Sequence, residues 1–221
     1  SMLLSPEVER AFDLGQESEK MRDSYGRTRT GQSILLARRL VEAGCKFVTA
    51  DAYAHNHWDT HATNDKSMRE ELAPPLDQAL AALMEDLKQR GLLDSTVIFW
   101  SGEFGRLPIS QHGNGRDHNR HAFSLLLAGG GFQRGHVHGA TDDFGYRATE
   151  SRVGCPDLHA TLLHQLGLES TPIQNTLLNQ EVGDCGVNVG TGAEPDGTAR
   201  VMGGELNVRQ LCDGRTFDSL E

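Results

Sequence analysis

Three histidines and one aspartate fall within seven residues of the sequence, in the run HNHWDTH at positions 55–61. Asp59 and His61 are two residues apart, a spacing that places both side chains on one side of an extended segment. A carboxylate and an imidazole placed in this way bind Zn²⁺ or Mn²⁺ most readily. The alternative is a polar surface loop in which His55, His57 and His61 have no function. The density of ligand-type residues favours a metal site.

A second group of polar residues, Gly102 to Arg106, directly follows a predicted strand. Glycines at 102 and 105 permit a tight turn and a close approach of the backbone. Glu103 is a candidate metal ligand or general base, and Arg106 is a candidate clamp for an anionic oxygen of a substrate. The alternative is an ion pair between Glu103 and Arg106 that only holds the loop together.

The third group is the run GRDHNRH at 115–121. His118 or Asp117 would complete the ligand set of a metal, or Asp117 would orient a ligand histidine from behind it. Arg116 and Arg120 are candidate binders of an anion. The alternative is a helix N-terminus capped by Asp117. His136 and His138 alternate on a predicted strand and are expected to be exposed.

Alternating helices and strands would position these groups. Helices are predicted within 5–20 and over 31–43, 74–90 and 156–166, and strands over 45–50, 96–100 and 123–128. This alternation predicts an α/β fold, a three-layer sandwich with a mainly parallel central sheet whose strand at 96–100 is buried on both faces. Ligands of such sheets bind beyond the carboxyl ends of the strands. The first two groups of polar residues lie at these ends, because they follow the predicted strands at 45–50 and 96–100. Residues 1–170 are predicted to form one domain, and residues 171–221 an irregular tail or small cap.

Composition narrows the class of protein. The formal net charge of −10 over 221 residues, without clustered Lys and Arg, argues against nucleic acid as a partner. It also disfavours an anionic substrate unless a bound cation reverses the field locally. The sequence has no apolar run long enough to span a membrane. It also has no signal peptide, and no CxxC pair of the zinc-finger type.

Several short motifs, in this order, resemble the family known as domain of unknown function 1501, which belongs with the alkaline phosphatase and sulfatase superfamily. The motifs are Trp58-Asp59-Thr60-His61 with Asn64, Leu92-Leu93-Asp94, Gly102 to Arg106, Gly115 to His118 and Leu127 to Gly131. Further matches are Tyr25-Gly26, Gly31-Gln32-Ser33, Leu36 to Leu40 and Asp157 to Thr161. The resemblance runs from about residue 4 to 168.

The resemblance implies an alkaline-phosphatase-like α/β fold and hydrolysis of phosphate or sulfate esters at one or two metals. Asp59 and His61 then look like ligands of one metal, Glu103 like the carboxylate after a central strand, and His118 like a late histidine ligand. Asp117 is a weaker counterpart. Family members are about twice this long, so the chain is expected to correspond to their C-terminal half, without the first metal-binding aspartate and the nucleophile. The resemblance also implies export to the periplasm or beyond.

These observations lead to one functional hypothesis and two alternatives. The hypothesis is a metal-dependent hydrolase that activates water against a small anionic phosphate or sulfate ester. Zn²⁺ is the first choice of cation, with Mn²⁺, Ca²⁺ or Mg²⁺ as alternatives. Its ligands would be Asp59, His61, Glu103 and His118, with His55, His57 and Asp117 in reserve, and Arg106 or Arg116 would stabilise developing charge. The alternatives are a non-catalytic binding domain that keeps the fold, and an inactive fragment whose site a homo-oligomer would complete.

Overall fold

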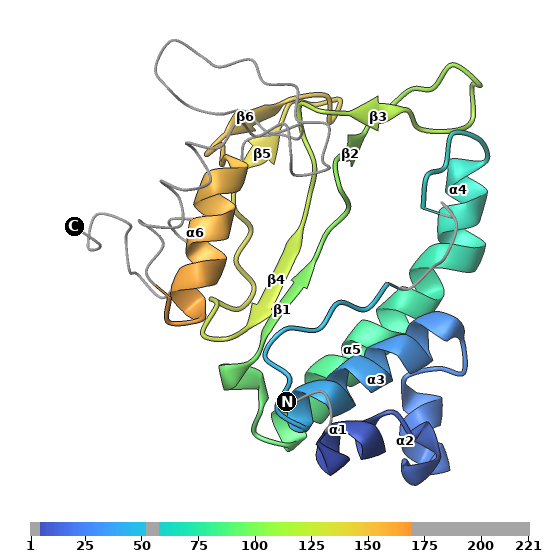
Figure 1. The fold of residues 1–221 in the computed structure, drawn as a ribbon. Coiled ribbons are helices and arrows are strands. Elements are labelled where there is room, and N and C mark those ends of the chain that lie inside the picture. Colours follow the sequence, from blue (N-terminus) through green and yellow to red (C-terminus); the bar gives the residue numbers. More distant parts are fainter. Residues whose placement is uncertain (1–4, 52–57, 169–221) are drawn as a thin grey trace. The chain divides into compact units, whose positions relative to one another are not determined.

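The computed structural model describes residues 5–51 and 58–168, which fall into two compact units (Figure 1). Of the described residues, the first unit contains 5–51, 58–93 and the short segment 112–115, and the second contains 94–111 and 116–168. The described part of the first unit is helical, and that of the second unit combines small antiparallel sheets with one helix. The described chain is therefore a mixed α and β structure.

Local sequence signals account for the helices of the first unit. They are α1 (Pro6–Ala11), α2 (Glu19–Ser24), α3 (Arg29–Glu42), α4 (Asn64–Ser67) and α5 (Ala73–Gln89), with a 3₁₀ turn at Leu14–Gln16 and a π-helical turn at Met68–Leu72. Ser5 Oγ accepts the Val8 N–H at the start of α1, and α5 begins with prolines in its first turn. Gly44 follows α3 with a φ of 97°, the left-handed C′ conformation. The predicted helices at 5–20, 31–43 and 74–90 are confirmed.

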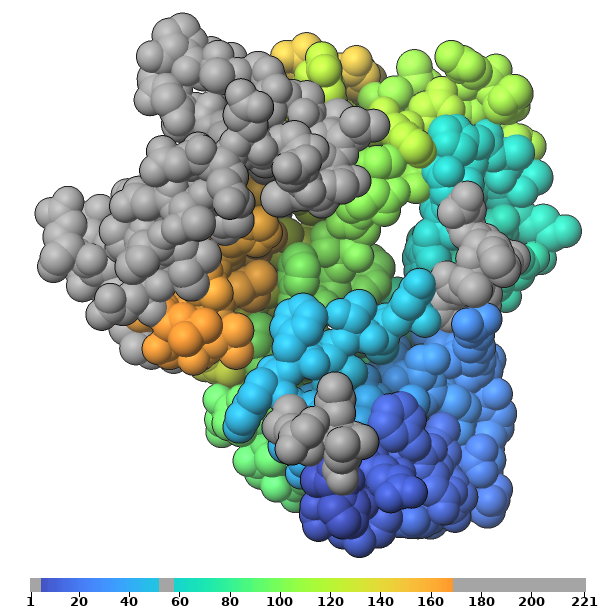
Figure 2. Space-filling model, in the orientation of Figure 1, coloured from blue at the N-terminus to red at the C-terminus, as the bar shows by residue number. Residues whose placement is uncertain are grey.

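The apolar core of the first unit lies between α3 and α5, which run side by side (Figure 1). Its buried members are Tyr25, Ile34, Leu35 and Ala79. In the space-filling view, the atoms of α1, α2 and α3 form one continuous surface, coloured blue (Figure 2). Helices this short are marginal in isolation, so the shared core is what stabilises them.

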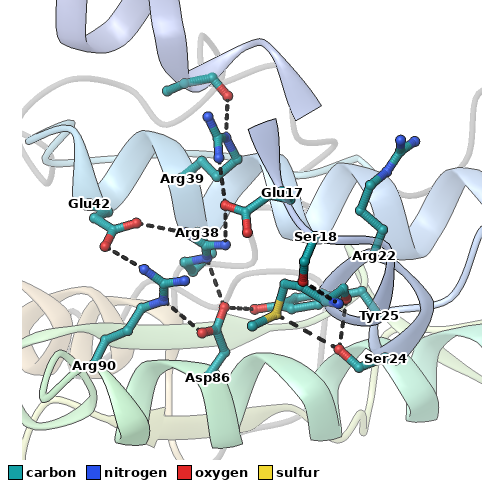
Figure 3. A network of polar contacts seen from close by, with 12 residues as sticks. Glu17, Ser18, Arg22, Ser24, Tyr25, Arg38, Arg39, Glu42, Asp86 and Arg90 are labelled. Carbon is teal, nitrogen blue, oxygen red and sulfur yellow. Dashed lines mark hydrogen bonds and ion pairs between the residues drawn. The ribbon is translucent and has the colours of Figure 1, made fainter. Parts of the chain in front are cut away.

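A buried polar network crosses this core (Figure 3). The Arg38 guanidinium of α3 lies 2.7 Å from Glu17 Oε1. Arg38 Nε lies 2.8 Å from Asp86 Oδ2 on α5, close enough for an ion pair although the N–H does not point along a hydrogen bond. The Tyr25 hydroxyl donates to the same Asp86 oxygen at 2.9 Å. Burial, and then the Asp86 carboxylate, raise the pKa of Tyr25 well above its ordinary value, so this hydroxyl remains a donor.

The second unit holds three small antiparallel sheets and one helix among its described residues. β1 (Val97–Trp100) pairs with β4 (Leu126–Gly129), β2 (Gly105–Arg106) with β3 (His118–Asn119), and β5 (Ala140–Thr141) with β6 (Ala148–Glu150). A 3₁₀ turn at Leu93–Ser95 precedes β1. The helix is α6 (Cys155–Gln165), which begins where predicted, and Asp157 Oδ2 accepts the Gly154 N–H there at 3.1 Å.

The mainly parallel sheet expected from the alternation of elements is not what the described strands form. β1 and β4 are antiparallel, with Trp100 opposite Leu126. Parallel neighbours need a crossover connection, usually a helix, whereas the segment between β1 and β4 contains only the β2–β3 pair. The three-layer sandwich with a parallel sheet stays a prediction for the fold as a whole.

The strand at 96–100 was expected to be buried on both faces, and this is wrong for its carboxyl end. Trp100 is 38 % exposed, and its neighbour across the sheet, Leu126, is 42 % exposed. Successive side chains on a strand point to opposite faces. Leu127 therefore packs on the α6 side with Val153 and Leu158, and Leu126 points to the other face. An apolar run identifies the strand, but burial depends on a layer being present on each side.

The strand predicted at 45–50 is also wrong. These residues form no regular ladder among the described parts of the chain, and Phe47 is 85 % exposed. A run of residues that favour strands cannot supply the neighbour that its backbone groups require. Over 5–51 and 58–168, no helix combines the length and apolar character needed to cross a bilayer.

Candidate metal centre

A tight turn brings Asp59 and His61 together in the first unit. The His61 N–H donates to the Asp59 carbonyl at 3.0 Å, closing a three-residue turn. The same turn places His61 Nε2 3.1 Å from Asp59 Oδ1. Both residues are half-buried. The expected pairing of these two side chains is therefore present, although a turn produces it and not an extended segment.

Hydrogen bonds to the neighbouring backbone hold this turn in place. The hydroxyl of Thr60, which is buried, bonds Asn64 Oδ1 at 2.5 Å. The backbone N–H groups of Thr63 and Asn64 donate to Asn114, to its side-chain oxygen at 3.1 Å and its carbonyl at 3.0 Å. Asn114 thus caps the start of α4 from a distant part of the sequence. Thr63 has a φ of 54°, an uncommon conformation for a residue other than glycine.

Gly115 follows Asn114 and packs directly on the turn that contains Asp59 and His61. A Cβ at this position would lie 1.8 Å from the His61 carbonyl oxygen, so any larger residue would force the two backbones apart. The two backbones approach so closely that only a glycine fits at position 115. The segment 112–115 is therefore tied to the turn that holds Asp59 and His61.

The second unit arranges two of the other predicted residues, Arg106 and His118, around the ring of Phe104 and places Glu103 beside Arg106. Arg106 places its guanidinium 5.4 Å from the centre of this ring, a cation–π distance. The imidazole of His118 lies 4.1 Å from the same ring, centre to centre. Arg106 Nη2 is also 3.6 Å from Glu103 Oε1. The pairing of β2 with β3, which sets Arg106 opposite His118, produces this arrangement.

Asp117 has a structural part in the same loop. Its carbonyl accepts the Leu107 N–H at 2.7 Å, and its own N–H donates to Ile109 at 3.2 Å. Its carboxylate oxygen Oδ2 accepts the Gln111 N–H at 2.9 Å. The sequence interpretation of Asp117 as a helix cap is wrong, since this segment contains no helix. The observed bonds orient the loop that leads into His118.

The remaining predicted residues divide into two groups. Arg116 is half-buried in the second unit. His55 and His57 lie outside the described residues. Phe104 and Asn114 were not singled out by sequence reasoning. The signal for Phe104 was its place between Glu103 and Arg106, while Asn114 owes its contacts to chain folding over 50 residues, which no local pattern reports.

Positive charge gathers near the end of β3. The pKa of His121 is lowered by burial first, and then by the guanidinium groups of Arg147 and Arg120. His121 also stacks on Tyr146, with ring centres 5.8 Å apart. The Arg120 and Arg147 guanidinium groups create a local positive field beside His121, in a chain whose net charge is negative.

Removal of the Phe104 ring tests whether it orients His118. A double-mutant cycle of Phe104→Ala with His118→Ala should give a coupling free energy of unfolding of about 0.5–1.5 kcal/mol, the usual range for ring pairs. Phe104→Ala with His164→Ala is the control, and these changes should be additive within about 0.5 kcal/mol. Additivity in both cycles would show that the ring contact does not hold His118.

Comparison with known proteins gives a family but no close relative. No curated protein matches the chain, and no solved structure does so. A family model described as a protein of unknown function, DUF1501, matches residues 2–188 and thus extends past residue 170, where the sequence places its domain boundary. Because this match covers most of the sequence, the chain belongs to the DUF1501 family of proteins of unknown function.

Proposed function

We propose that this protein is a metal-dependent hydrolase of small phosphate or sulfate esters, with water as the attacking group. Asp59, His61 and His118 would hold the cation, and Glu103 would be a further ligand or the base. The proposal joins the ligand-type residues of both units to the resemblance of the motifs to the alkaline phosphatase and sulfatase superfamily. That superfamily relation is part of the proposal, as are the three-layer sandwich fold and a homo-oligomeric assembly.

The geometry of Asp59 and His61 is the observation that carries the proposal. Oxygen and nitrogen ligands lie about 2.0–2.2 Å from Zn²⁺, so two neighbouring ligand atoms are about 2.9–3.5 Å apart. Asp59 Oδ1 and His61 Nε2 are 3.1 Å apart. A cation would fit between these two atoms without a large movement of either side chain. The residues present therefore fit a metal.

Chain connectivity supports the choice of His118. Gly115 contacts the His61 carbonyl within the first unit, and His118 follows it by three residues. Three residues span at most about 11 Å even when fully extended. His118 is exposed, so its imidazole is accessible to a ligand. The covalent chain thus restricts His118 to the neighbourhood of the turn.

The types of donor favour zinc. Imidazole nitrogens suit Zn²⁺ and other late transition metals, whereas Ca²⁺ and Mg²⁺ prefer sites built from oxygen alone. Two histidines with one or two carboxylates form a set of the kind found in zinc hydrolases. Mn²⁺ is the next choice, because it accepts a larger share of oxygen ligands.

The chemistry assigned to each residue follows from charge. A bound divalent cation would lower the pKa of water to about 7 and offset charge on the ester. Glu103, which is exposed, would accept the proton of the attacking water. Arg106, fixed against Phe104, and Arg116 would bind the ester oxygens and stabilise their growing charge.

Metal removal tests this function. We expect the purified chain to hydrolyse at least one of a panel of aryl phosphate mono-, di- and triesters and aryl sulfates. Chelation should lower the rate by about 100-fold or more, because several kcal/mol of transition-state stabilisation are lost. Addition of Zn²⁺ should restore the rate, and elemental analysis should find the metal before chelation.

Two outcomes would contradict the proposal. Activity that is unchanged in chelator, in protein shown to be free of metal, would exclude a metal mechanism. Stoichiometric metal without turnover of any ester on the panel would instead favour a binding domain that keeps the site without the reaction.

A further inference from the structure

His136 and His138 form a pair in the second unit, on the segment that leads into β5. Their ring centres are 5.7 Å apart, with an angle of 40° between the planes. Contrary to the sequence expectation, they do not lie on a strand, and both residues are half-buried while Val137 between them is 86 % exposed. Residues at i and i+2 point to the same side of an extended segment.

The Nε2 atoms of both rings are buried and have no hydrogen-bond partner in the part of the chain that the structure describes. A buried nitrogen without a partner loses its hydration and gains nothing in return, at a cost of about 1–3 kcal/mol. Native structures tolerate few such atoms, and an ion or a water usually accounts for them. Two such nitrogen atoms in one pair of rings indicate that the rings share a ligand.

We propose that His136 and His138 together bind one Zn²⁺, Cu²⁺ or Ni²⁺ ion through their Nε2 atoms. The ring centre of a ligand histidine lies about 3.2 Å from the metal, so two such rings at ligand angles of 90–180° are roughly 4.5–6.4 Å apart. The observed 5.7 Å falls inside this range. Paired imidazoles select these late transition metals over Ca²⁺ and Mg²⁺.

This site does not depend on the proposed ester hydrolysis, and Zn²⁺ titration can separate the two. In metal-stripped full chain labelled with ¹⁵N-histidine, the Nε2 resonances of His136 and His138 should shift together as the first equivalents of Zn²⁺ are added. The same shifts should occur in Asp59→Ala, because its change leaves this pair intact. They should be absent from the double variant His136→Asn/His138→Asn.

Stoichiometry provides an independent measurement. The double variant should bind one Zn²⁺ fewer per chain than the wild type by calorimetry, whereas the control His112→Asn/His164→Asn should bind the same number as the wild type. Equal stoichiometry for the double variant and the wild type would overturn the proposal. So would shifts that occur only at the large Zn²⁺ excess needed by a free histidine peptide, which would show adventitious binding only. The wild-type titration decides the question even if the double variant does not fold.

Discussion

Replacement of Arg38 with methionine should lower the free energy of unfolding of the helical unit by about 3–5 kcal/mol, the cost of breaking a buried ion pair. The Arg38 side chain is fully buried and lies within 2.6–2.8 Å of carboxylate oxygens on Glu17, Glu42 and Asp86 (Figure 3). Methionine fills much of the same volume but leaves Glu17 and Asp86 without their shared cation. Chemical denaturation followed by circular dichroism measures the change.

The control for Arg38 is an arginine that forms ion pairs on the surface. Arg27 is 40 % exposed and pairs with Glu19 and Asp23, so Arg27→Met should cost less than about 1 kcal/mol. Similar losses for the two variants would show that burial of Arg38 adds nothing to its ion pairs.

The network around Arg38 should also change how the stability of the protein depends on pH. Burial by itself would raise the pKa of Glu17, but hydrogen bonds from Arg38 and Arg39 lower it below its ordinary value. A carboxylate with a lowered pKa contributes stability above its unfolded pKa of about 4.3, and that contribution is lost as pH falls through the folded pKa. Stability of Arg38→Met should therefore fall less steeply below pH 4 than that of the wild type.

Asp59→Ala should weaken Zn²⁺ binding by more than about 100-fold, beyond the 10–100-fold typical of residues behind the ligands. Ester turnover should fall by a similar factor if the proposed function holds, because activation of water requires the bound cation. The turn itself should persist, since the His61 N–H bonds the Asp59 backbone carbonyl and not its side chain. Calorimetry of Zn²⁺ binding and steady-state kinetics measure the two effects.

Asp77→Ala is the matched control for Asp59. Asp77 is an exposed aspartate on α5 in the same unit, so its removal should change neither Zn²⁺ affinity nor the melting temperature. Equal rates for wild type and Asp59→Ala would rule out the metal mechanism. If Asp59→Ala lowered the melting temperature and Asp77→Ala did not, the Asp59–His61 pair would instead have a structural role.

The sequence predicted helices better than it predicted burial within them. On α3, the structure buries the charged residue Arg38 together with Ile34 and Leu35. A periodic pattern assumes that charged residues face water. Arg38 is an exception because Glu17 and Asp86, 21 and 48 positions away in sequence, supply the opposite charges that make its burial tolerable.

In the candidate site, too, the local contacts were predicted and the long-range contacts were not. Asp59 and His61 were predicted as a pair from their spacing, since a contact across two residues depends only on the local backbone. The contact of Phe104 with His118, and that of Gly115 with His61, join positions 14 and 54 residues apart. Residue types alone gave no account of them.

The features that could be predicted are therefore local: the caps and prolines that start helices, the glycine that ends α3, and the ligand-type spacing of the Asp59 turn. These features depend on interactions within a few residues, whose free energies a sequence pattern contains. Long-range packing is what makes β1 and β4 antiparallel, leaves residues 45–50 without a strand, and buries the Nε2 atoms of His136 and His138. Strand pairing and burial both require a partner from elsewhere in the chain, and that partner is in place only once the chain has folded.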